Sequence, residues 1–252
     1  MSEHVSIEHQ DRITTITINR PAKKNALTQA MYAAMADAIT LYAGGGAARA
    51  LVITGTGDMF TSGNDLSDFS TGGADDGVPP VARFLQAIKD CPKPLIAAVN
   101  GGAIGVGLTM LLHCDLVYAG ESAVLSAPFV GLGLVPEAAS SLLLPAAVGM
   151  AMANDIFLTG RRISAQEALD CGLVARVFPD EALAEEVRKI ALQVAASSPV
   201  AMTRTKALVR YQRDKVTAQM AAEGKAFAEQ LKSPDFAEVI AAKMQKRAPV
   251  FG

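Results

Sequence analysis

Apolar and polar residues alternate at the start of the chain and then change to a helical spacing. Residues 5–8 and 13–19 alternate with period two around the polar residues 10–12, which predicts an opening β-hairpin. In residues 28–43, apolar side chains recur every three or four positions, and three glycines at 44–46 end the run. We therefore expect the first helix to follow the hairpin.

Three later runs predict strands that are covered on both faces. Each is short and continuously apolar, a pattern typical of parallel strands buried between layers. The runs are residues 51–54, 95–99 and 116–119. Residues 81–90 and 105–113 are predicted to be helical. Strands that alternate with helices in this way indicate an α/β fold.

From residue 138 onward the pattern is mainly helical. Ser164 and Glu167 form a capping-box pattern, and Ser233 places a good N-cap before Pro234 at a first helical position. Helical periodicity covers residues 181–196, 200–213, 215–231 and 234–246. We therefore expect a strand-and-helix core over residues 1–195 and a helical C-terminal region over residues 196–252.

Composition limits the class of protein. With 252 residues, 50% of them hydrophobic, the chain can bury a large core. Its formal net charge of −2 and its lack of Lys/Arg runs give no electrostatic reason to expect nucleic acid. The longest weakly charged stretch, residues 122–153, is interrupted by prolines and is typical of buried core, not of a membrane span. Three scattered cysteines without metal-type spacing suit a reducing cytoplasm.

Candidate chemistry lies in two glycine-rich loops that each follow a predicted strand. Residues 60–66 (FTSGNDL) follow the predicted strand at 51–54, and residues 101–107 (GGAIGVG) follow the predicted strand at 95–99. Gly63 and Gly105 let the backbone turn sharply and approach a ligand closely. Because the first N–H groups of a helix lack internal partners, such loops can bind an anion. Two exposed N–H groups can hold one developing oxyanion.

Glu137 is the candidate carboxylate, in a stretch otherwise poor in ionisable groups. Among apolar neighbours its carboxyl is expected to be partly desolvated, which raises its pKa toward the value that a base for a weak carbon acid needs. Two simpler explanations stay open. The glycines can serve only as turns, and Glu137 can be a helix N-terminal carboxylate favoured by the helix dipole. In the functional interpretation, the N–H groups of the two loops and the carboxylate of Glu137 are the minimum apparatus for enolising a thioester.

Several further segments occur together in a fixed order. They are residues 19–21 (NRP), 25–27 (NAL), 62–66 (SGNDL), 92–101 (PKPLIAAVNG), 114–115 (CD), 159–161 (TGR), 165–168 (AQEA) and 172–174 (GLV). In these segments the chain resembles the crotonase (enoyl-CoA hydratase/isomerase) superfamily over essentially its whole length. The resemblance implies a spiral of ββα repeats, with CoA and the active site in residues 1–195, and C-terminal helices that support trimers or dimers of trimers.

The resemblance also implies which groups carry the chemistry. It places the two oxyanion donors at the backbone N–H groups of Asn64 and Val106, where the family usually has Ala and Gly. The two catalytic glutamates of the family's hydratases correspond to Thr109 and Phe129, and neither side chain can usefully transfer a proton. Glu137 stands where peroxisomal-type Δ3,Δ2-enoyl-CoA isomerases carry their catalytic glutamate. We therefore expect an isomerase that shifts a 3-enoyl-CoA double bond to the 2-position, with Glu137 as the proton shuttle.

The resemblance further implies a set of residues that bind the substrate and its CoA. They are Lys24, Ala26, Ser62, Gly63, Asp65, Leu66 and Gly105. Lys24 is the candidate phosphate partner, and a solvated surface lysine is the alternative. The implied reaction needs no metal and no cofactor beyond the CoA of its substrate. The resemblance implies a homotrimer or hexamer. We expect a cytoplasmic protein, since the chain ends without a peroxisomal tripeptide.

Two other kinds of function stay open at this point. A hydratase, a ring isomerase or a hydrolase would keep the fold and the oxyanion hole and change the chemistry. A CoA-thioester-binding protein without turnover would keep only the binding site. The sequence predicts neither the acyl chain length nor whether the substrate is linear or a ring.

Overall fold

A six-stranded, mostly parallel sheet forms the centre of the molecule. The computed structural model describes residues 2–65 and 77–252. The first two strands form the predicted antiparallel hairpin, and the other neighbours in this sheet are parallel. In spatial order the strands are β1 (Val5–Gln10), β2 (Ile13–Ile18), β3 (Ala50–Gly55), β5 (Leu95–Val99), β7 (Leu116–Gly120) and β10 (Arg176–Phe178). The three predicted buried strands are β3, β5 and β7, so these predictions are confirmed.

A second sheet consists of strands of two or three residues each. In spatial order they are β4 (Met59–Thr61), β6 (Gly102–Ile104), β8 (Val124–Ser126) and β9 (Ile163–Ser164). Because β4, β6 and β8 directly follow β3, β5 and β7, the same two-strand unit recurs three times and adds its second strand to the smaller sheet. This recurrence is the spiral of repeats that the resemblance implied. Periodicity did not predict these strands, because two or three residues carry no readable alternation.

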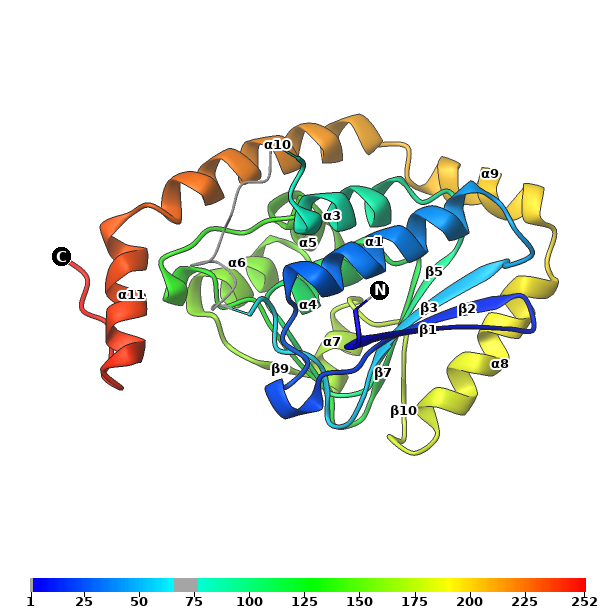
Figure 1. Cartoon of the computed structure of the whole chain (residues 1–252), viewed down its shortest axis with the longest axis horizontal. Helices are drawn as coiled ribbons and strands as arrows, with labels where there is room; N and C mark the ends of the chain where they lie inside the picture. The colour runs from blue at the N-terminus through cyan, green and yellow to red at the C-terminus, as the bar shows by residue number, and fades with distance from the viewer. Residues whose placement is uncertain (1, 66–76) are drawn as a thin grey trace.

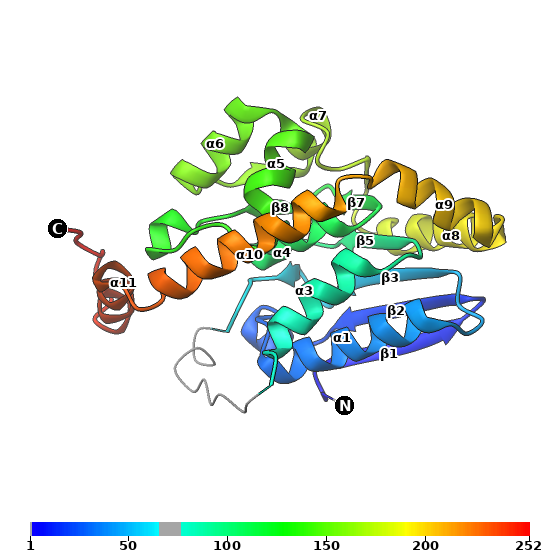
Figure 2. The ribbon, with the colours of Figure 1, turned by 90° about the horizontal axis from the view of Figure 1, so that it is seen from above.

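Helices cover both faces of the larger sheet (Figure 1). Two helices, α1 (Gln29–Gly44) and α3 (Pro80–Asp90), lie side by side on one face (Figure 2), and α8 (Leu183–Ala196) covers the other. Alternation along β3 supplies both faces, since Ile53 belongs to the buried cluster under α1 and Val52 to the cluster under α8. The predicted first helix is confirmed.

The C-terminal region is helical, as predicted. α9 (Pro199–Val209), α10 (Arg213–Gln230) and α11 (Pro234–Met244) follow one another, and α10 crosses the molecule and packs on α5 (Ser140–Val148) (Figure 2). The hydroxyl of Ser233 accepts a hydrogen bond from the backbone at the start of α11, which confirms the predicted N-cap.

Three shorter helices complete the core. The segment predicted as one helix at residues 105–113 begins as α4 (Val106–Thr109) and continues as a 3-10 helix (Met110–His113), whose tighter turns often end short helices. α6 (Met150–Thr159) and α7 (Ala165–Asp170) lie between β8 and β10 in the chain. The predicted capping box is present at the start of α7.

Candidate active site

The loop after β4 is held so that the N–H of Asn64 is available to a ligand. Asn64 forms a parallel bridge with Leu27, in which Leu27 N donates to Gly63 O at 2.8 Å and Asp65 N donates to Leu27 O at 2.9 Å. A parallel bridge uses the peptide groups on either side of its central residue, so the N–H of Asn64 itself points the other way. Within the described ranges, this N–H has no acceptor.

The loop after β6 leaves a second N–H available at the start of α4. Gly105 has φ 59° and ψ −119°, a combination closed to residues with a Cβ, and its N–H donates to Ser126 O at 2.8 Å. Val106 is the first residue of α4, where helical N–H groups lack an internal partner. Among residues 2–65 and 77–252, no acceptor faces the Val106 N–H.

Asn64 and Val106 line one cavity of about 860 Å³. Their loops touch, because a Cβ added to Gly63 would lie 2.9 Å from the carbonyl oxygen of Ile104. Part of the lining is apolar and comes from Phe129, Leu132, Leu134, Phe227, Ile240 and Met244, while Arg20, Lys23 and Lys243 bring positive charge. Helices α10 and α11 therefore help to enclose the cavity, which draws on both of the predicted regions of the chain.

Glu137 lies in a turn that His113 fixes. Ala138 and Ala139 follow it with φ 60° and 56°, a left-handed conformation that costs a residue with a Cβ roughly 1–2 kcal/mol. His113 Nε2 lies 2.7 Å from the carbonyl oxygen of Ala138, so this nitrogen carries the proton and donates it. Burial lowers the pKa of His113 to about 4, which keeps the ring neutral at pH 7. Such a contact can hold the strained turn in place.

Glu137 is half-buried as a residue, and its carboxyl is set deep in the protein. The Thr109 hydroxyl donates a hydrogen bond to its Oε1. Burial raises the pKa of Glu137 to about 7, the Thr109 hydrogen bond opposes that rise, and the negative charge of Glu223 adds to it. A carboxyl that titrates near neutral pH is suited to accepting a proton and returning it.

Two side chains, Thr109 and Tyr32, relate Glu137 to the glycine loops. Thr109, its hydrogen-bond donor, is the last residue of α4. Tyr32 on α1 donates to Asn64 Oδ1, and its own pKa is raised by burial and then by the charge of Glu137, so it lies near both. Glu137 is not among the described residues that line the cavity, whereas Leu134, three residues before it, is. The carboxyl therefore lies at the end of α4, three residues beyond a residue of the cavity wall.

The other predicted binding residues are distributed unevenly. Those that line the cavity are Ala26, Ser62, Gly63, Asp65 and Gly105. Lys24 is exposed and stands outside the lining, whereas its neighbour Lys23 is part of it. Leu66 lies outside the described residues. Asp65 accepts a hydrogen bond from the Arg20 guanidinium at 2.6 Å, so both charges at this side of the cavity are paired.

Sequence reasoning did not assign Tyr32 and His113 to the site. Each contacts the site across a long stretch of chain, from position 32 to 64 and from 113 to 138, and no spacing rule connects such positions. For Thr109, the family resemblance did indicate a place in the site. It occupies a position where the family's hydratases have a glutamate, so its side chain was already expected to face the reacting groups, although only as a residue unable to transfer protons.

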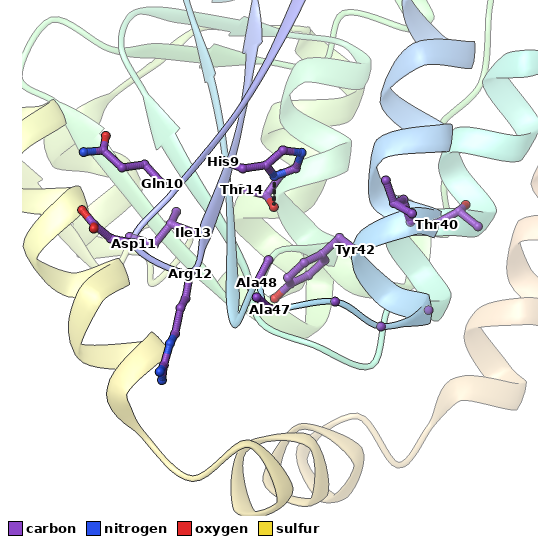
Figure 3. Close-up of a pocket in the computed structure, with 14 residues that line it drawn as sticks. His9, Gln10, Asp11, Arg12, Ile13, Thr14, Thr40, Tyr42, Ala47 and Ala48 are labelled. Carbon is purple, nitrogen blue, oxygen red and sulfur yellow. Dashed lines mark hydrogen bonds between the residues drawn. The ribbon is translucent and has the colours of Figure 1, made fainter.

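A second cavity, of about 730 Å³, lies at the turn of the opening hairpin and the C-terminal end of α1 (Figure 3). His9 borders it and pairs with Thr14 at 3.0 Å, and neither glycine loop contributes to its lining. Over the described ranges, no group of three or more His, Cys, Asp or Glu side chains is arranged to hold a metal ion. In the same ranges, we find no helix with the length and apolar character needed to cross a membrane.

Comparison with known proteins identifies the family. Residues 8–252 match the family described as enoyl-CoA hydratase/isomerase. The 2,3-dehydroadipyl-CoA hydratase of Escherichia coli (strain K12) is 35% identical over 256 residues, which cover 100% of this chain and 99% of that protein. Enoyl-CoA delta isomerase 2 of Rattus norvegicus is 39% identical over 215 residues, covering 83% of this chain and 55% of that longer protein.

A solved structure agrees with this match. The crystal structure of an enoyl-CoA hydratase/isomerase from Pseudoalteromonas atlantica T6c has a TM-score of 0.97 at 52% identity, and the match covers 99% of this chain and 100% of that one. The family match covers residues 8–252, and the hydratase relative and the solved structure cover at least 99% of the chain. The protein belongs to the enoyl-CoA hydratase/isomerase family, the crotonase superfamily of acyl-CoA enzymes.

Proposed function

We propose that this protein is a Δ3,Δ2-enoyl-CoA isomerase, which moves the double bond of a 3-enoyl-CoA into conjugation with the thioester. The thioester carbonyl binds between the N–H groups of Asn64 and Val106, and Glu137 removes a proton from C2. The resulting dienolate carries its negative charge on the thioester oxygen, where the two N–H groups stabilise it. Glu137 then returns the proton to C4, so the reaction balances without a metal or a redox cofactor.

The proposal depends on one observation, a carboxyl with a pKa raised to about 7 beside two N–H groups without acceptors in the described chain. Hydration by the family's two-glutamate route needs a second proton-transfer group, and the residues at those positions are Thr109 and Phe129. Among the described lining residues, the carboxylate present is Asp65, which is paired with Arg20. One base is enough for isomerisation.

Thr109 supports a shuttle that gains and loses a proton. When Glu137 is ionised, the Thr109 hydroxyl donates to it. The same hydroxyl lies 3.4 Å from the carbonyl oxygen of Val106, a second acceptor. When Glu137 holds the substrate's proton, the hydroxyl can turn to Val106 and accept from the carboxyl. Both protonation states thus keep a hydrogen-bond partner, which limits the movement of the base between the two proton transfers.

The proposal can be tested with two substrates by following the absorbance of the conjugated thioester. An isomerase increases the absorbance of the conjugated thioester when it receives trans-3-enoyl-CoA. A hydratase decreases that absorbance when it receives trans-2-enoyl-CoA, and hydration is the main alternative because the E. coli relative that spans the whole chain is a hydratase. Binding of both thioesters without any change in absorbance would contradict both enzyme assignments and favour a CoA-thioester-binding protein.

The raised pKa of Glu137 predicts how the rate depends on pH. The base works only as the carboxylate, so kcat for 3-enoyl-CoA is expected to rise through a midpoint at about pH 7 and to level off above it. An ordinary glutamate would give a midpoint about two to three units lower. Steady-state rates from pH 5 to pH 9 measure the midpoint. A flat profile across this range would show that no group with the titration of Glu137 limits turnover.

Tyr32 is expected to position one of the oxyanion donors. Tyr32→Phe leaves the side-chain oxygen of the half-buried Asn64 without its donor, and a hydrogen bond of this kind is worth about 0.5–1.5 kcal/mol. We expect a several-fold lower kcat, measured by the same absorbance assay. Tyr42→Phe is the matched control, because Tyr42 donates to Pro94 O at 2.9 Å and does not line the active-site cavity. Unchanged turnover in both variants would mean that the Tyr32 hydroxyl does not position Asn64.

The placement of CoA and the assembly of the protein are also proposals. We assign the CoA part to the side of the cavity that contains Ala26, Ser62 and Asp65, with Lys23 beside them. The homotrimer or hexamer in the cytoplasm stays a prediction. Large apolar side chains at the end of α9 support self-association, since Leu208 is 77% exposed and Val209 is 73% exposed.

A further inference from the structure

Helix α10 buries a carboxylate close to the turn that carries Glu137. Glu223 is 6% exposed and is the residue of this helix that is fully buried, while the rest of the helix is exposed or half-buried. A helix that packs on a core normally buries apolar side chains, because a buried charge is unfavourable unless hydrogen bonds or partners compensate it. The acid at this position therefore needs a structural or functional reason.

Glu223 holds the N-terminus of α5. Its Oε1 accepts from the backbone N–H of Ser141 at 2.9 Å and from the Ser141 hydroxyl at 2.5 Å, and Gln219 donates to the same hydroxyl at 2.8 Å. Ser141 is the second residue of α5, where the N–H groups of the first turn stabilise a negative charge. Because α5 begins three residues after Glu137, this contact fixes the far end of the turn whose middle His113 holds.

The two carboxylate oxygens of Glu223 differ in their hydrogen bonding. Oε2 is buried, and in the described part of the chain it has no hydrogen-bond partner. A buried charge is screened less than one at the surface, so it acts over a longer range. Glu137 is within that range, because the charge of Glu223 contributes to the raised pKa of the Glu137 carboxyl.

The other groups around Glu137 do not supply a comparable charge. Tyr32 on α1 is neutral, since burial raises its pKa, and His113 on the 3-10 helix is neutral, since burial lowers its pKa to about 4. Thr109 on α4 is a neutral donor. The cations Lys89, Lys206 and Arg210 act on His113 and are not among the groups that shift the pKa of Glu137. Among the residues that the structure describes, Glu223 on α10 is thus the charged group that acts on Glu137.

We propose that Glu223 is a positioning residue of the proton shuttle, which anchors the turn of Glu137 through Ser141 and makes the Glu137 carboxylate a stronger base through its own negative charge. This inference rests on the function proposed above for Glu137. A base of higher proton affinity removes the weakly acidic C2 proton more readily, as long as it remains ionised at the working pH. The buried acid thus serves the reaction without touching the substrate.

An infrared titration tests the charge effect without using turnover. The carboxylic C=O band of Glu137 is assigned as the band that Glu137→Gln removes, and its midpoint is followed with pH in wild type and variants. We expect Glu223→Gln to lower the midpoint by roughly half a pH unit or more, because loss of a nearby negative charge favours the ionised form. Thr109→Val is expected to raise the midpoint, because it removes a donor to the carboxylate.

Two variants separate charge from loosening of the turn. Ser141→Ala removes a donor to Glu223 and keeps its charge, so the midpoint is not expected to fall. Glu229→Gln removes an exposed charge from the same helix and is expected to leave the midpoint unchanged. Since Glu223→Gln places an amide NH₂ where Oε2 has no partner and can impair folding, Glu223→Met is the second test and is expected to lower the midpoint as well.

A midpoint that stays at the wild-type value in Glu223→Gln or Glu223→Met would overturn the proposal, even if these variants melt earlier, because a purely structural anchor changes stability without changing the titration of Glu137. A midpoint that falls equally in Ser141→Ala would also overturn it, since loosening alone would then explain the effect. Failure of wild-type protein to isomerise 3-enoyl-CoA would instead contradict the proposed function and leave the titration result standing.

Discussion

Glutamine in place of Glu137 is expected to lower kcat for 3-enoyl-CoA isomerisation by roughly 10³-fold, within the range that a general base contributes. Glutamine has the size of glutamate and can still accept the hydrogen bond from Thr109, so the two loops and the cavity keep their shape. It cannot take the proton from C2. The increase in conjugated-thioester absorbance measures the loss, and calorimetric binding of a saturated acyl-CoA is expected to give the wild-type Kd.

The same substitution is expected to stabilise the protein above neutral pH. The folded state holds the proton of Glu137 with a pKa of about 7 against 4.5 for an unperturbed glutamate, so the unfolded chain loses it first as the pH rises. Wild-type stability therefore falls as the pH rises from one value to the other, and Glu137→Gln avoids that loss, which amounts to roughly 3 kcal/mol at pH 8. A higher Tm together with lost turnover would exclude misfolding as the cause.

Glu121→Gln is the matched control for this pair of effects, because Glu121 is exposed in the turn after β7. It is expected to change neither kcat nor the dependence of Tm on pH. If Glu137→Gln keeps more than about a tenth of the wild-type rate, its carboxyl is not the base, since general-base catalysis is worth at least about 10²-fold.

The fold was predictable wherever a segment was long enough to show a period. The hairpin, α1, β3, β5, β7 and the C-terminal helices all have four or more residues that repeat one pattern. The smaller sheet was not predictable in this way, because its strands have two or three residues and their pairing is set by neighbours distant in the chain. Only the family resemblance implied the repeated two-strand unit.

The site was predictable to the extent that it is local in sequence. Gly63 and Gly105 are visible because only glycine suits the turns that aim the neighbouring N–H groups, and Glu137 is visible as an isolated acid among apolar residues. The groups that tune these parts come from other elements. Tyr32 reaches Asn64 from α1, and Glu223 acts on Glu137 from α10, so their roles depend on packing that no spacing pattern records.

Alanine in place of Gly63 is expected to have the second large effect on turnover, because it disturbs both oxyanion donors. Gly63 has φ 92°, which a residue with a Cβ rarely adopts, and the new Cβ would lie 2.9 Å from the carbonyl oxygen of Ile104. One loop must then move away from the other. Gly63 precedes Asn64, and Ile104 leads through Gly105 to Val106, so the movement separates the two N–H groups that hold the thioester oxygen.

Loss of one oxyanion donor lowers kcat by about 10²–10³-fold in a comparable site, and we expect a loss of that size here. Gly46→Ala is the control for strain alone, because Gly46 has φ 81° with nothing within 4 Å of the added Cβ and lies away from the active-site cavity. Both variants are expected to melt earlier, but only Gly63→Ala is expected to lose turnover in the absorbance assay. Equal rates in the two variants would mean that the spacing of the loops does not determine catalysis, and the carbonyl would then have to be held by groups other than the N–H of Asn64 and the N–H of Val106.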